Sequence, residues 1–90
     1  MFEVRYSYEA EEAIGQYFEN YQSFGYRTDM PQRAFHVSRV IACLTHIDAY
    51  WEETFVVDGK NYIRIENICT IEFEITNDFT AIVIMNIYFD

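Results

Sequence analysis

The fold of this chain is decided by the stretch TFVVDGKNYIRIENICTIEFEITNDFTAIVIMNIYF, which runs from Thr54 to Phe89. Apolar and polar residues alternate along much of it with the period of two that is typical of strands. Asp58-Gly59 is a strong signal for a two-residue hairpin turn, and Glu66-Asn67 and Asn77-Asp78 mark further turns. The pattern predicts consecutive strands over residues 54–57, 60–66, 68–76 and 79–89.

The last of these strands, Phe79–Phe89, is rich in β-branched and aromatic residues. Because it is too apolar for an exposed edge strand, we expect it in the middle of the sheet. In the strands before it, one set of alternating residues is apolar and is expected to meet the helices. The other set carries Arg64, Glu72 and Glu74 toward water or toward a partner.

A strand and two helices are expected before the sheet. Residues 2–6 alternate apolar and charged side chains, as in a half-buried strand. Ser7 stands where an N-cap belongs, and apolar spacings of three and four predict a helix from Tyr8 to about Phe24. Asp29 as a cap and Pro31 in the first turn predict a second helix from Pro31 to about Tyr50, antiparallel to the first. Its expected core side chains are Phe35, Val37, Val40, Ile41, Leu44, Ile47 and Trp51.

A length of 90 residues indicates one domain, residues 1–90, and the predicted strands and helices make it α+β. Of its residues, 51% are hydrophobic. The formal charge of −9 makes the chain a poor non-specific binder of nucleic acid, because phosphate binding rests on lysine and arginine. Such a charge suits a solvated acidic surface, a basic partner or mimicry of nucleic-acid charge. The N-terminus lacks a signal-peptide pattern, and no apolar run approaches the roughly 20 residues that span a bilayer, so we expect a cytoplasmic protein without membrane contact.

The cysteines and histidines do not predict a metal site. Cys43 and Cys69 have no C-x-x-C partner, and two buried, reduced thiols are expected. His36, Cys43 and His46 fall roughly on one stripe of the second helix, but no carboxylate completes a ligand set. We therefore expect no metal and no cofactor.

The order of elements, β-α-α-β-β-β-β, is carried by the opening FEVRYSYEAEEAIGQYF and the closing NYIRIENICTIEFEITNDFTAIVIMNIYF. This order resembles the RelE/ParE superfamily of toxins from bacterial toxin–antitoxin systems. Ala10-Glu-Glu-Ala-Ile14 takes the place of the family's first-helix motif. The resemblance implies an opening strand, an antiparallel helical hairpin and a twisted antiparallel sheet. It also implies a cognate antitoxin or another protein partner, and it is compatible with a homodimer.

The chain differs from the family at positions where the RNA-cleaving relatives have their catalytic residues. The family's Tyr-Arg pair falls at Cys69-Thr70, and Asn86 or its neighbours replace a basic residue near the end of the last strand. Those relatives use lysine and arginine to hold phosphate and to stabilise developing charge. The remaining weak catalytic candidates are Lys60, Tyr62 and Arg64. The resemblance therefore favours a gyrase-poison-like toxin that acts through protein contact, and we do not expect the chain to be an enzyme.

The predicted binding residues are Arg64, Glu72, Glu74 and Tyr88. Arg64 either anchors a partner or pairs across strands with Glu72, and we favour the pair. Glu72 and Glu74 suit either acid–base chemistry or, as we favour, a solvated face. The aromatic side chains Trp51, Tyr88 and Phe89 are expected in the core, and together on the surface they would mark an interface. An alternative function is an acidic inhibitor or adaptor that blocks a basic nucleic-acid-binding surface of a partner.

Overall fold

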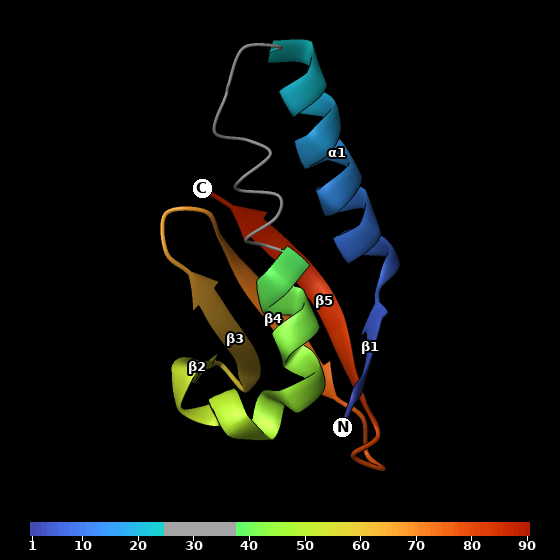
Figure 1. Cartoon of the computed structure of the whole chain (residues 1–90), viewed down its shortest axis with the longest axis vertical. Coiled ribbons are helices and arrows are strands. Elements are labelled where there is room, and N and C mark those ends of the chain that lie inside the picture. Colours follow the sequence, from blue (N-terminus) through green and yellow to red (C-terminus); the bar gives the residue numbers. More distant parts are fainter. Residues whose placement is uncertain (25–37) are drawn as a thin grey trace.

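The computed structural model describes residues 1–24 and 38–90, with side chains for residues 1–17 and 38–90. Residues outside these ranges include the expected connection after Gly25 and the second helix's start at Asp29 and Pro31. They also include the predicted core side chains Phe35 and Val37 and the candidate His36. The chain forms β1 (Glu3–Tyr6), α1 (Tyr8–Phe24), a helical segment over residues 38–53, and β2 to β5 (Figure 1). The latter strands are Thr54–Val57, Lys60–Ile65, Cys69–Ile75 and Ala81–Phe89. The predicted order of elements in the described ranges is confirmed.

The five strands form one sheet in the order β1-β5-β4-β3-β2. The last strand, β5, lies between β1 and β4, which confirms its predicted place inside the sheet. Strands β2 to β5 are antiparallel, as expected of consecutive strands. The opening strand β1 joins β5 in parallel, so the whole sheet is mixed rather than antiparallel. The helix between β1 and the later strands makes this parallel crossover possible.

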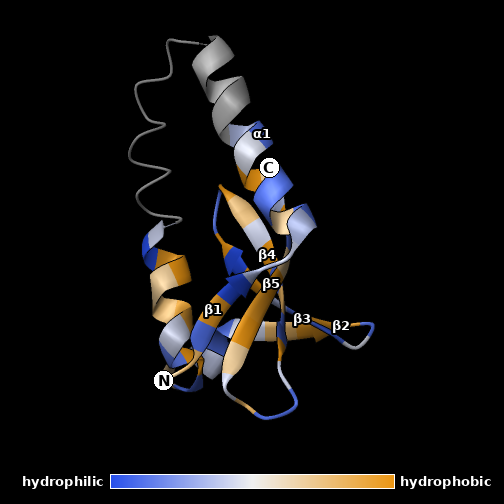
Figure 2. Cartoon of the chain, turned by 90° about the vertical axis from the view of Figure 1, so that its right-hand side faces the viewer, coloured by the Kyte–Doolittle hydropathy of each residue, from blue (hydrophilic) through white to orange (hydrophobic). Residues whose placement is uncertain are grey.

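Both helical segments pack on one face of the sheet and run in opposite directions (Figure 1). Figure 2 shows α1 above the strands and the segment 38–53 along one side of them. The core between the layers is apolar and mostly β-branched: Ala10, Leu44, Ile47, Ile63, Ile65, Cys69, Ile71, Phe73, Ile82, Ile84 and Ile87. Farther along α1, the ring of Tyr17 stacks on that of Phe89 with centroids 3.8 Å apart. Within the described residues, no helix is both long and apolar enough to cross a bilayer.

Ser7 connects the start of α1 to an irregularity in β5. As predicted, it caps the helix: its Oγ accepts a hydrogen bond from the Ala10 N–H at 3.1 Å. The same hydroxyl donates to the carbonyl of Met85 at 2.6 Å. Met85 is the extra residue of a β-bulge, because Glu72 pairs with Asn86 whereas Phe73 pairs with Ile84. One hydroxyl therefore fixes both the helix start and the bulged strand.

Replacing Ser7 with alanine is expected to lower the free energy of unfolding by about 1–2 kcal/mol, because a cap and a carbonyl partner are lost together. Urea unfolding followed by circular dichroism measures this loss. Ser7→Thr retains the hydroxyl and is the matched control, with an expected change within about 0.5 kcal/mol. Equal stability of the alanine variant and the wild type would contradict the assigned role.

The segment 38–53 differs from prediction in its second half. Residues 38–43 are α-helical, whereas Leu44–Glu53 form the 3-10 helix η1, with a kink at His46. A regular α-helix would place Trp51 on the same stripe as Leu44 and Ile47, but the kink at His46 and the tighter 3-10 winding break that period. Trp51 is accordingly 46% exposed, and its predicted core position is wrong.

The turn at Asp58-Gly59 is the predicted two-residue hairpin. Both residues have positive φ, 52° for Asp58 and 76° for Gly59, as a type I′ turn requires. This turn matches the right-handed twist of the flanking strands, and it sets the pairing of Val57 with Lys60. The register of β2 and β3 follows from it.

Candidate functional site

One face of the sheet has no described helix packed against it, and we call it the open face. Side chains of a strand alternate between faces, so the strand pairing assigns its members directly. The open face comprises Phe55, Val57, Lys60, Tyr62, Arg64, Thr70, Glu72, Glu74, Val83, Asn86 and Tyr88. All predicted catalytic and binding candidates lie on it.

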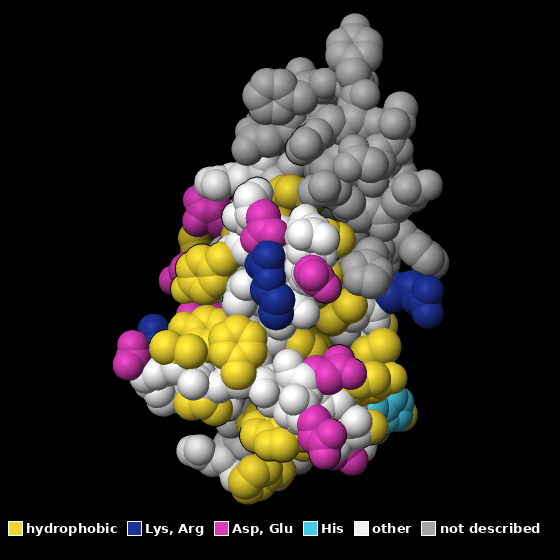
Figure 3. All heavy atoms as spheres, turned by 90° about the vertical axis from the view of Figure 1, so that its left-hand side faces the viewer, with side chains coloured by type: hydrophobic (Ala, Val, Ile, Leu, Met, Phe, Trp, Pro, Cys, Tyr) yellow, Lys and Arg dark blue, Asp and Glu magenta, His cyan; other side chains and the backbone are white. Residues whose placement is uncertain are grey.

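Part of the open face is aromatic. Phe55 on β2 stacks on Tyr62 of β3, with ring centroids 5.5 Å apart. Phe55 is 42% exposed and Tyr88 on β5 is 49% exposed, so the expected core position of Tyr88 is wrong. Figure 3, which views the molecule from the left-hand side of Figure 1, shows hydrophobic side chains gathered near a basic side chain with acidic ones beside it. Half-exposed aromatic side chains of this kind are enriched at protein interfaces.

Arg64 is held by Asp90 and not by Glu72, so the favoured cross-strand pair is wrong. The guanidinium donates from Nη1 to Asp90 Oδ1 at 2.7 Å and from Nη2 to Oδ2 at 2.6 Å. Nη1 also donates to Thr70 Oγ1 at 3.1 Å. The bond to Asp90 raises the pKa of Arg64. Asp90 is in reach because its N–H bonds the Ile68 carbonyl at 2.9 Å, whereas Glu72 lies opposite Tyr62.

Glu72 is nearly buried, contrary to the expectation that it faces water. It is 9% exposed, and its Oε1 accepts a hydrogen bond from the Tyr88 hydroxyl at 2.9 Å. This bond raises the pKa of Tyr88, because the phenol proton is shared with a carboxylate. The burial arises because β4 is an inner strand whose neighbours place Tyr62 and Asn86 opposite Glu72.

The candidates divide into two groups along the strands. Tyr62, Arg64, Glu72 and Tyr88 come together around the middle of β3 and β4. Lys60 lies directly after the hairpin turn. Glu74, which is exposed as predicted, lies near the C-terminal end of β4. The three catalytic candidates therefore share a face, but the guanidinium among them is already occupied by a carboxylate.

Asp90 is the residue of this site that sequence reasoning missed. It lies directly after β5, where a lone acidic residue carries no pattern that would connect it to Arg64. Only the register of β4 with β5, in which Thr70 pairs with Tyr88, brings it close.

The two cysteines differ in environment. Cys69 is buried, as expected, and burial raises the pKa of its thiol to about 11. Cys43 is exposed, which contradicts the expectation of two buried thiols. His46 is exposed at the kink of η1, and residues 1–24 and 38–90 include no cluster of three metal-ligating side chains.

A thiol reagent is expected to react with the two cysteines at different rates. At pH 8 Cys43 should react with dithionitrobenzoate quickly, whereas Cys69 should react only after unfolding, because the thiolate is the nucleophile and burial disfavours it. Release of thionitrobenzoate measures both rates, and Cys43→Ser should remove the fast phase alone. Two equally fast thiols in the folded chain would contradict the burial of Cys69.

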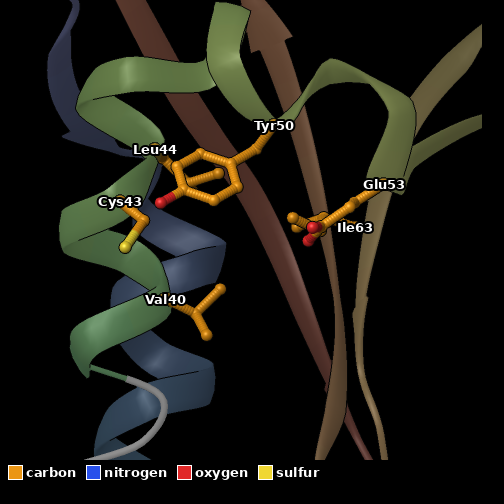
Figure 4. A pocket seen from close by; sticks show the side chains of 6 residues that line it. All are labelled: Val40, Cys43, Leu44, Tyr50, Glu53 and Ile63. Carbon is orange, nitrogen blue, oxygen red and sulfur yellow. The ribbon is translucent and has the colours of Figure 1, made fainter.

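A small hollow lies on the helix side of the sheet, beside the segment 38–53 (Figure 4). Its volume is about 90 Å³, and its lining is Val40, Cys43, Leu44, Tyr50, Glu53 and Ile63. Sites for small-molecule ligands usually measure about 300–1,000 Å³. The open face, rather than this hollow, is therefore the better candidate site.

Comparison of the chain with protein-family models, with curated proteins and with solved structures gave no match.

Proposed function

We propose that this protein is a RelE/ParE-like toxin of a type II toxin–antitoxin system that acts in the cytoplasm by protein–protein contact, in the manner of a gyrase poison. The proposal combines the resemblance in sequence with the character of the open face. In this reading the open face contacts the target, and a cognate antitoxin neutralises the protein.

Action by protein contact is favoured over RNA cleavage because the guanidinium of Arg64 is already bound by the carboxylate of Asp90. A ribonuclease of this type needs cationic groups that meet phosphate and stabilise developing negative charge. Both outer nitrogens of Arg64 donate to Asp90, and the face around it offers the carboxylates of Glu72 and Glu74. Phosphate would have to displace Asp90 and approach these carboxylates. The aromatic part of the face needs no such rearrangement to bind a protein.

Two assays with the purified chain test this choice. DNA gyrase should lose supercoiling activity in its presence, and translating ribosomes should retain intact messenger RNA. Arg64→Ala should leave the gyrase effect within about twofold, because Arg64 is held by Asp90 in the wild type. Ribosome-dependent cleavage that is abolished by Arg64→Ala would contradict the proposal.

A second function, an acidic inhibitor or adaptor, is favoured by the charge of the chain. The formal charge is −9, and the arginines Arg5 and Arg64 are paired with Glu3 and Asp90. A protein of this kind would cover a basic nucleic-acid-binding surface. Its affinity for that surface should then fall steeply between about 50 and 200 mM salt, as ion-pair-driven binding does. A salt-insensitive affinity would exclude this second function.

A further inference from the structure

The side chain of Glu72 is a nearly buried carboxylate without a cation. Its exposed fraction is 9%, and its hydrogen-bond donor is the neutral hydroxyl of Tyr88. It forms no ion pair with any lysine or arginine in the described part of the chain. A carboxylate that loses water without gaining a cation lowers stability, and such an arrangement favours a cationic ligand from outside.

Two of the three cations on the open face are committed to carboxylates, and the third, Lys60, lies beside the hairpin turn at the start of β3. Arg64 is clamped by Asp90, with the closest contact at 2.6 Å. Arg5, which continues the open face on β1, pairs with Glu3 at 3.0 Å. Glu72 therefore faces a surface with a surplus of negative charge, whose complement is basic.

Aromatic side chains stand on both sides of this carboxylate. Tyr62 lies directly opposite Glu72 on β3, and Tyr88 reaches it from β5. Faces of tyrosine rings attract cations, and a guanidinium also stacks flat on them. A carboxylate between two tyrosines thus combines the charge and the flat surfaces that suit an arginine side chain.

We propose that the open face holds an arginine side chain of the protein partner, with its guanidinium donating to the Glu72 carboxylate and lying against Tyr62 and Tyr88. This site deepens the proposed function, on which it rests, by specifying what the partner presents. Arginine suits it better than lysine because the planar guanidinium can donate and stack at once. A phosphate group would instead meet a like charge at Glu72.

The site is testable without a known partner, by titrating the full-length, ¹⁵N-labelled chain with N-acetyl-arginine amide and following amide shifts by NMR. Binding in the millimolar range is expected, with the largest shifts at Tyr62, Glu72 and Tyr88. N-acetyl-citrulline amide has nearly the same shape without the charge, and it should bind at least about fivefold more weakly. Glu72→Gln should weaken arginine binding by a similar factor, because it keeps the acceptor for Tyr88 and removes only the charge.

Glu74→Gln is the matched control, since Glu74 lies on the same strand and face but is exposed. It should leave the arginine affinity within about twofold. If Glu72→Gln fails to fold, Tyr62→Leu removes a ring instead and should weaken arginine binding severalfold. Equal binding of arginine and citrulline amides, or shifts spread over the acidic surface and unchanged by these variants, would overturn the site. Growth arrest by a chain that fails this titration would leave the proposed function standing and remove only the arginine site.

Discussion

Replacing Phe73 with alanine is expected to lower the free energy of unfolding by about 3–5 kcal/mol. Phe73 is completely buried at the centre of β4, and it is the largest of the fully buried side chains. It pairs with Asn61 on β3 and with Ile84 on β5, directly beside the bulge. The neighbouring strands are held by their own hydrogen bonds and can close the resulting cavity only in part.

Urea unfolding measures this loss, with Phe79→Ala as the matched control. Phe79 is an exposed phenylalanine in the turn before β5, and the same truncation there should change stability by no more than about 0.5 kcal/mol. A domain of this size has a stability of about 5–10 kcal/mol, so the Phe73 substitution should remove a large part of it. Equal losses of stability in the Phe73 and Phe79 variants would contradict the central place of Phe73 in the core.

On the proposed function, replacing Tyr88 with alanine is expected to raise the concentration of the protein that half-inhibits gyrase supercoiling by about 30-fold. Tyr88 is half-exposed on the open face and donates to Glu72. Tyrosines in such places are frequent hot spots, whose removal typically lowers binding by about 2 kcal/mol, the equivalent of this factor. The inhibition curve measured over a dilution series gives the value.

Tyr8→Ala is the control for this prediction, because Tyr8 is also exposed but lies at the start of α1, away from the open face. It should leave the half-inhibitory concentration within about twofold. Tyr88→Phe keeps the ring and loses only the hydrogen bond, and it should have an intermediate effect. A loss of inhibition that is equal for the Tyr8 and Tyr88 variants would show that the open face has no special part in the contact.

The strands were predictable from sequence because their signals are local. Alternation with a period of two, together with the Asp58-Gly59 turn, gave β2 with its observed bounds and placed β5 inside the sheet. The cap at Ser7 is equally local, since its helical partner is the N–H three residues later. The second hydrogen bond of Ser7, to the carbonyl of Met85, joins two residues that are separated by most of the chain, and no pattern in the sequence predicts it.

The errors share a physical cause, which is dependence on geometry that a linear pattern does not contain. A period of 3.6 residues predicts a core position for Trp51, but η1 is a 3-10 helix with a kink at His46, and Trp51 faces outward. Strand alternation alone predicts that Glu72 faces water, but the neighbouring strands bury it. Cross-strand pairing predicts Glu72 as the partner of Arg64, whereas the partner in the structure is Asp90. The candidate residues were thus identified, but their partners were not.

The most direct test of the central claim is a count of colony-forming cells after the chain is expressed without any partner. Wild type and Tyr8→Ser are expected to lower the count by at least about 100-fold, whereas the folded double variant Tyr62→Ser/Tyr88→Ser should leave it unchanged. Undiminished colony counts with the wild type, or an equal fall with the double variant, would contradict a toxin that acts through the open face.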